Sequence, residues 1–231
     1  GVADEFSLLK AVVADNKAHA PAALQFHTGH IAEARPSIGS WLSYGLGSEN
    51  ENLPGFVTIH PQGDGRVHGS GFLPAMHQGT PLRVPRKDGE VAIKNLNDRE
   101  ANPESQRLRL NFLQSMNQRL LERVTADAQM EGIIESFELA FRMQQDAAEA
   151  FDVAKEPKHV QEMYGTGVHG RQTLIARRLL DRGVRFVQLW HGAGQPWDNH
   201  SDIEANHRKL AAQIDQPIAA LLTDLKQSGM L

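Results

Sequence analysis

The sequence predicts an α/β protein with a parallel sheet, and three neighbouring segments carry this prediction. Residues 184–191 alternate as a strand does, and both of their faces are largely apolar, as in a strand buried on both sides. An amphipathic helix at residues 170–182 ends at Gly183 and leads directly into that strand. A loop with two Gly and a Pro follows, and then a long amphipathic helix at residues 203–225. A helix that leads into a buried strand is typical of parallel sheets.

Composition limits the class of protein. The 231 residues carry a net charge of -4, are 40% hydrophobic and include no Cys. We therefore expect a single domain, no nucleic-acid partner and no membrane span, and disulfides and thiolate metal sites are excluded. The chain starts without Met and stops at Gly229-Met230-Leu231, just after a helix. These ends favour an internal fragment, truncated at both ends.

The first sixty residues predict four short elements. Residues 5–14 are expected to form a strand and residues 18–29 a helix, with a Pro in its first turn and a Gly at its end. Residues 36–47 predict a second helix, and residues 53–60 a turn followed by a strand. The apolar residues of the second helix predict its inward stripe: Ile38, Trp41, Leu42 and Leu46.

The middle of the chain predicts an irregular segment and then helices. Residues 61–102 are rich in Gly and Pro and lack periodicity, so we expect a long irregular excursion there. Residues 103–148 predict a helical hairpin, with helices at 103–122 and 127–148, and residues 156–165 predict a further short helix. Some polar side chains are expected to face solvent and are left outside the site: His60, His68, His77, Arg177 and Arg178.

Asp198 and His200 lie just beyond the carboxyl end of the strand at residues 184–191. Open α/β sheets hold their ligands at this edge, and an Asp and a His two residues apart can supply half of a divalent metal site. A surface loop with ordinary polar residues is the alternative. His191, at the end of the strand, is either a substrate contact or a His that hydrogen-bonds to backbone.

The whole chain resembles the family catalogued as domain of unknown function fifteen-oh-one, exported bacterial proteins similar to sulfatases. The resemblance is carried by residues 35–49, 53–57, 69–74, 138–144, 155–165 and 176–200. It implies a doubly wound, mostly parallel sheet of the alkaline phosphatase superfamily, with flanking helices and a metal site at its carboxyl edge. It also implies an exported, periplasmic location. Of the metal-binding regions of that superfamily, the middle one matches Asp198 and His200 here.

A second similarity concerns residues 19–29. Sulfatases carry Cys-x-Pro-Ser-Arg-Ala-x-x-x-Thr-Gly with the nucleophile first, and this chain has a Pro and a closing Thr-Gly in the same register. His19 then stands at the nucleophile position, where a formylglycine cannot form. The His could bind metal, bind an anion or accept a phosphoryl group. It could equally serve only to satisfy the first turn of the helix.

The sequence thus leads to two hypotheses. The first is a metal-dependent hydrolase of sulfate or phosphate esters, catalytically incomplete in this fragment, which acts on a small molecule or a polysaccharide. In it, Asp198 and His200 bind a divalent metal ion, while His19 acts as the catalytic residue and contacts substrate together with Asn16 and His191. The second is a non-catalytic cell-surface or carbohydrate-binding protein that keeps the sulfatase-like fold, which the absence of a Cys or Ser nucleophile favours.

Overall fold

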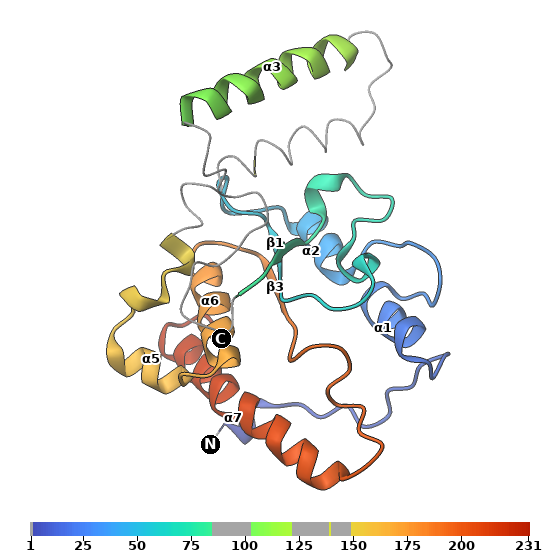
Figure 1. The fold of residues 1–231 in the computed structure, drawn as a ribbon, viewed down its shortest axis with the longest axis vertical. Helices are drawn as coiled ribbons and strands as arrows, with labels where there is room; N and C mark the ends of the chain where they lie inside the picture. Colours follow the sequence, from blue (N-terminus) through green and yellow to red (C-terminus); the bar gives the residue numbers. More distant parts are fainter. Residues whose placement is uncertain (1, 85–102, 122–138, 140–148) are drawn as a thin grey trace.

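A three-stranded parallel sheet forms the centre of the fold (Figure 1). The computed structural model describes residues 2–84, 103–121, 139 and 149–231. Four short 3-10 segments accompany the main elements: η1 Ala3–Glu5, η2 Gly65–His68, η3 Ala75–His77 and η4 Val153–Lys155. The helices and strands are α1 His19–Thr28, α2 Ile38–Leu46, β1 Phe56–Ile59, β2 Thr80–Leu82, α3 Pro103–Leu121, α5 Lys158–Tyr164, α6 Val168–Leu180, β3 Phe186–Leu189 and α7 Ile203–Gln227.

The strands run in the order β2-β1-β3, and both pairings are parallel. The predicted α/β class with a parallel sheet is therefore confirmed, as is a strand within residues 184–191. The prediction that this strand is buried on both sides is wrong. All four residues of the central β1 are buried, whereas those of β3 are only half-buried, because β3 lies at an edge of the described sheet.

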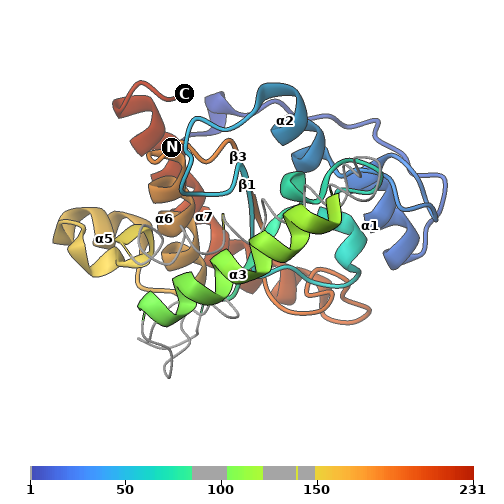
Figure 2. The same cartoon turned by 90° about the horizontal axis from the view of Figure 1, so that it is seen from above.

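Helices flank both faces of the sheet (Figures 1 and 2). Val57 and Ile59 belong to a buried cluster that includes Ile175 and Leu179 of α6. Phe56 points to the opposite face, since side chains alternate along a strand, and its ring lies against α2. Helix α7 packs on α6, so α6 and α7 form one side of the molecule while α1 and α2 form the other.

Helix α2 contacts the sheet through its smallest residues. A Cβ atom at Gly39 would lie 2.6 Å from ring atoms of both Phe56 and Phe186, so only Gly permits this approach. Ser40 and Ser43 are buried beside it. The predicted inward stripe is therefore wrong, and its four residues are exposed by 36% to 60%: Ile38, Trp41, Leu42 and Leu46.

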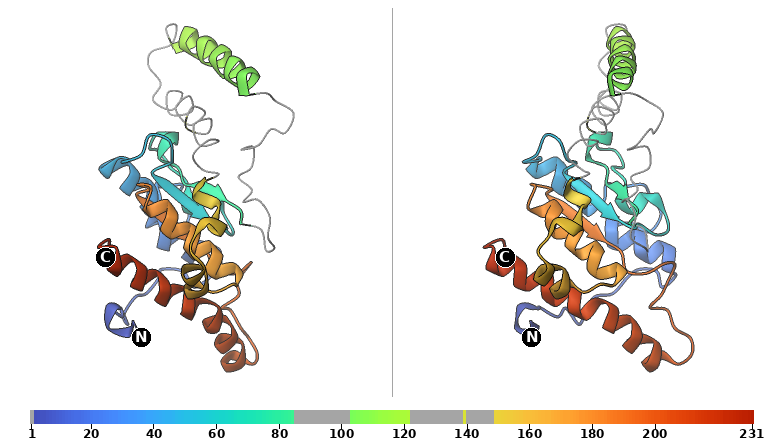
Figure 3. Two further views of the ribbon diagram at one scale, coloured as in Figure 1. Left: turned by 90° about the vertical axis from the view of Figure 1, so that its left-hand side faces the viewer. Right: turned by 60° about the vertical axis from the view of Figure 1, so that its left-hand side comes forward.

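Two further expectations, both for the N-terminal half of the chain, differ from the structure. Residues 6–14, expected within a strand, are exposed and pair with no strand of the described part of the chain, and Val13 is 91% exposed. A β ladder needs a partner, and this segment instead connects η1, where Glu5 pairs with Lys226 of α7, to α1 (Figure 3). Within the segment expected to be irregular, the structure places β2 beside β1, while residues 85–102 lie outside the described residues.

The remaining helices follow the sequence more closely. Helix α1 ends at Gly29, whose φ of 75° is left-handed, and α5 and α6 form where expected. Helix α3 confirms the first helix of the expected hairpin, and apart from Leu139 the second lies outside the described residues. Over the part of the chain that the structure describes, every helix is too short or too polar to cross a membrane.

Arg178 is buried and Arg177 is half-buried, which corrects the expectation that they face solvent. Arg178 is 5% exposed, and it pairs with Glu156 and donates to the carbonyls of Glu149 and Ala150. Arg177 Nε donates to Asp224 at 2.8 Å. We call the set of buried polar partners between α5, α6 and α7 the helical charge cluster: Glu156, Tyr164, Arg177, Arg178 and Asp224.

Candidate functional site

A cavity of about 630 Å³ opens where β1 and β3 end. Because the strands are parallel, their carboxyl ends meet at one edge, where the loops that follow them line the cavity. The two loops are joined by Gly194 N, which donates to Gln62 Oε1 at 3.2 Å. The lining residues are His19, His27, Gln62, Gln188, Leu189, Trp190, His191, Gly194, Gln195, Pro196, Trp197 and Asp198.

The structure brings His19, Asp198 and His200 together. Asp198 Oδ2 lies 2.8 Å from His19 Nε2, at the first turn of α1, and 3.2 Å from His200 Nε2. The hydrogen bond from His200 is the main cause that lowers the pKa of Asp198, and the charges of His200 and His19 act in the same direction. The three side chains are accessible, with exposed fractions of 53%, 34% and 86% for His19, Asp198 and His200.

His191 lines the cavity with both ring nitrogens engaged. Trp197 Nε1 donates to His191 Nδ1 at 3.1 Å, and an indole N–H can only donate. The ring proton is therefore on Nε2, which donates to Gln213 Oε1 at 3.0 Å. His169 packs edge-on against this ring, and its pKa is lowered by burial and by the charge of His191. These contacts hold the His191 ring in one orientation at the wall of the cavity.

Asn16 lies at the start of α1 and is not among the residues that line the cavity. Its Oδ1 accepts a hydrogen bond from Ala18 N at 2.8 Å, immediately before the first helical residue. This local turn shapes the entry of the chain into α1, which carries His19. The geometry therefore gives Asn16 a direct role in placing His19.

Comparison with known protein families identifies the family of this chain. A family described as "Protein of unknown function (DUF1501)" matches residues 1–231. The chain belongs to the DUF1501 family. It has no significant match among curated proteins or among solved structures. Membership of DUF1501 confirms the family resemblance seen in the sequence, and the site itself must supply the argument for function.

The donor types of the site suit a divalent ion, but their arrangement is that of a hydrogen-bonded cluster. Two imidazoles and a carboxylate are common zinc ligands. Both Nε2 atoms, however, point at one carboxylate oxygen rather than at a shared empty point. Among the described residues, no group of three or more His, Asp or Glu side chains has the geometry to hold a metal ion.

Sequence reasoning missed a polar chain that crosses the sheet beneath the cavity: Trp190, Thr58, Gln188 and His27. Thr58 and Gln188 are cross-strand neighbours in the β1–β3 register, which the sequence does not reveal. Gln188 could have been noticed as an amide within an apolar strand. His60, His68 and His77 are half-buried rather than solvent-facing, so that expectation is wrong.

Proposed function

We propose that this DUF1501 chain carries the site of an exported, metal-dependent hydrolase of sulfate or phosphate esters, of the sulfatase-like fold. The observation that supports the proposal best is the Asp198 carboxylate held between His19 and His200 at a cavity at the carboxyl edge of a parallel sheet. That edge is where α/β enzymes assemble catalytic groups from their loops. The substrate would be a small molecule or a polysaccharide that carries the ester.

The charge of the cavity lining supports the proposal that an anionic ester needs a cation in order to bind there. Among the described residues, this lining includes the carboxylate of Asp198 and no Lys or Arg. An anionic ester would therefore meet an acidic site, which costs free energy unless a positive charge is supplied. Asp198 and His200 would hold a divalent ion for this purpose, in place of the hydrogen bond that joins them here. Such an ion, when bound, polarises the ester oxygen.

His19 would act on the ester directly. Its Nε2 is engaged with Asp198 at 2.8 Å, an interaction that keeps the ring proton on Nε2 and leaves Nδ1 as the basic nitrogen. A carboxylate that holds an imidazole in one tautomer is the arrangement that activates histidines in hydrolases. His19 Nδ1 would accept either a proton from water or the transferred group itself.

The test is ester turnover, with added divalent ions, by the protein that contains these 231 residues. We expect release of nitrophenol from nitrophenyl sulfate or nitrophenyl phosphate, with loss of about a hundredfold or more in Asp198→Asn. Asp202→Asn is the matched control, because Asp202 lies outside the cavity lining and has a left-handed φ of 47°, which Asn tolerates. Equal rates for wild type and Asp198→Asn would contradict the assignment.

A second candidate, a non-catalytic carbohydrate-binding protein, is favoured by a different feature of the same cavity. Two indole side chains, Trp190 and Trp197, and three amide side chains line it, a combination that suits the apolar face and hydroxyl groups of a neutral sugar. Binding of neutral oligosaccharides that is lost in Trp197→Ala, without any ester turnover, would support this candidate over the hydrolase.

A further inference from the structure

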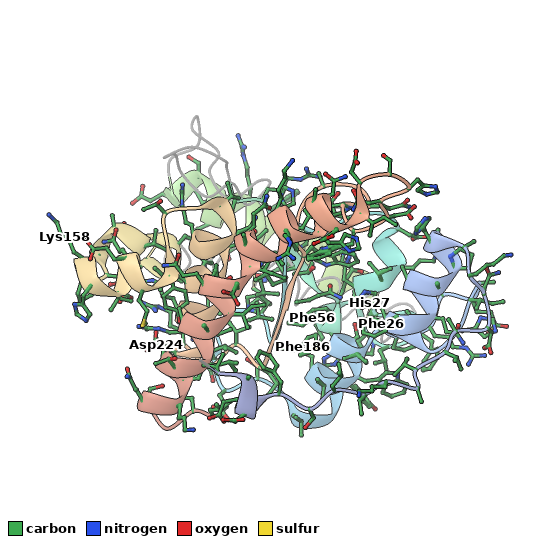
Figure 4. The ribbon with its side chains drawn as sticks, turned by 90° about the horizontal axis from the view of Figure 1, so that it is seen from below. Phe26, His27, Phe56, Lys158, Phe186 and Asp224 are labelled. Carbon is green, nitrogen blue, oxygen red and sulfur yellow. The ribbon has the colours of Figure 1, made fainter. Side chains whose placement is uncertain are left out.

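His27 lines the cavity, and the proposed hydrolase gives it no role so far. It lies in the last turn of α1, two turns beyond His19, and its ring packs against two aromatic side chains (Figure 4). The ring centroids of His27 and Trp190 are 5.1 Å apart, and those of His27 and Phe26 are also 5.1 Å apart, at right angles. The ring is therefore fixed in place on the side of the cavity formed by α1.

The polar chain that reaches His27 has a defined direction. Trp190 Nε1 donates to Thr58 Oγ1 at 3.2 Å, so the Thr58 hydroxyl proton must find another acceptor. Thr58 is fully buried, and its hydroxyl donates to Gln188 Oε1 at 2.9 Å. With its carbonyl oxygen thus engaged, Gln188 presents its NH₂ group to His27 Nδ1 at 3.0 Å.

This direction sets the tautomer of His27. Because Nδ1 accepts a hydrogen bond, the ring proton of the neutral imidazole resides on Nε2. Burial lowers the pKa of His27, and the charge of His68 on η2 lowers it further. The pKa of His68 is itself lowered by burial, against the opposing charge of Asp64. Near neutral pH, His27 is therefore a neutral ring that offers one N–H donor.

We propose that His27 binds the ester group of the substrate, its Nε2–H donating a hydrogen bond to an oxygen of the sulfate or phosphate. Thr58, Gln188 and Trp190 act as positioning residues that keep the donor on Nε2. The inference rests on the proposed function and assigns to it a further substrate contact. A neutral donor suits this cavity because the lining that the structure describes has no Lys or Arg to bind an oxyanion.

Two substitutions test the roles of the two ring nitrogens of His27 separately. In His27→Asn the amide oxygen can replace Nδ1 as the acceptor for Gln188, but no donor reaches the position of Nε2. In His27→Gln the longer amide can replace the Nε2–H donor. With inorganic phosphate and sulfate as probes, measured by calorimetry at neutral pH, we expect His27→Asn to weaken binding about tenfold and His27→Gln to recover most of that loss.

A second measurement determines the tautomer of His27 in the absence of any ligand. Ring ¹⁵N–¹H correlation spectra of the wild-type chain should show His27 as the Nε2–H tautomer. Thr58→Val has nearly the same shape but cannot orient Gln188, so it should give a mixture of tautomers while circular dichroism shows an intact fold. A wild-type His27 that carries its proton on Nδ1 would overturn the proposal.

The outcomes also separate this proposal from the hydrolase. If wild type binds phosphate or sulfate and His27→Asn binds it equally well, the role of His27 is overturned while the hydrolase stands. If no ester is turned over but anion binding depends on His27 as expected, the hydrolase is wrong and the contact stands. If wild type binds neither anion, the role of His27 is overturned as well.

Discussion

Two groups of polar side chains in this molecule are built in opposite ways. In the helical charge cluster, full charges lie between α5, α6 and α7, where each is matched by an opposite charge or a carbonyl. In the cavity, histidines and amides line an open space, and Asp198 is the one carboxylate among the described residues that line it. Figure 4 shows Asp224 of the cluster and His27 of the cavity at separate places.

This difference indicates that the helical charge cluster and the cavity have different roles. Buried charges whose partners are all supplied by the protein have no capacity left for a ligand, so the cluster serves to hold three helices together. Neutral groups with fixed tautomers leave donors and acceptors available at the cavity. We therefore expect substitutions in the cluster to change stability, and substitutions in the cavity to change binding.

The largest loss of stability should come from Arg178→Ala. It removes the partner of Glu156 and leaves the carbonyls of Glu149 and Ala150 without their donor. We expect the free energy of unfolding to fall by about 3 to 5 kcal/mol, measured by urea denaturation. Arg208→Ala removes an exposed pair with Glu204 and is the control, for which we expect almost no change. Similar losses in both variants would contradict the comparison.

The cavity side of the sheet is held by close packing, which Gly39→Ala tests. A methyl group there would meet Phe56 and Phe186 at 2.6 Å, so α2 must move away, and we expect a loss of about 1 to 3 kcal/mol in the same assay. Gly45→Ala, on the same helix with nothing within 4 Å, should instead stabilise by about 0.5 to 1 kcal/mol. Effects of one sign in both variants would contradict this packing.

Tyr164→Phe removes a single hydrogen bond from the charge cluster. The hydroxyl donates to Asp224 at 2.9 Å, and burial followed by this bond raises the pKa of Tyr164. We expect a loss of about 1 to 2 kcal/mol, because a buried carboxylate loses one donor. Tyr44→Phe, at an exposed ring, should leave the midpoint of denaturation unchanged. No loss in Tyr164→Phe would mean that water replaces the hydroxyl.

Acid should destabilise the fold through its half-buried histidines. Burial lowers the pKa values of His68 and His169 below their ordinary 6.5, so the unfolded chain binds protons first as the pH falls. Stability is therefore full above pH 6.5 and decreases below it, with a slope of at most about 1.4 kcal/mol per pH unit for each His. Urea denaturation at pH 7 and pH 5 should show a smaller decrease in His68→Gln and His169→Gln. An unchanged decrease would argue against their burial.

The smallest effect on stability should come from the residues that matter most for binding. Asp198 and His200 lie at the surface, so Asp198→Asn should leave the midpoint of urea denaturation where it is in wild type. The same variant should lose ester turnover. A large loss of stability would mean that Asp198 holds the loop rather than a ligand.

The sequence predicts what depends on neighbours along the chain. The strand before Asp198, the Gly29 end of α1 and the helix that leads into β3 all follow from local patterns. His19 near Asp198 follows from the family resemblance, not from spacing. In contrast, Thr58 and Gln188 meet across 130 residues, and only the strand register brings them together.

Packing and pairing explain the other differences. Helix α2 turns its small residues to the sheet because two Phe rings already fill the space beneath it, a fact that helical periodicity does not contain. Arg177 is half-buried because it packs against α7, where its partner Asp224 lies 47 residues away along the chain. Such pairs look like ordinary solvated helix charges until the helices are placed side by side.

The metal content of the chain tests the central claim, that Asp198 anchors a hydrolase site, most directly. Wild type and Asp198→Ala would be purified in buffer with added divalent ions, desalted and compared by mass spectrometry. We predict near-stoichiometric metal in wild type and its loss in Asp198→Ala. Wild type without metal, or a variant that retains it fully, would contradict the account.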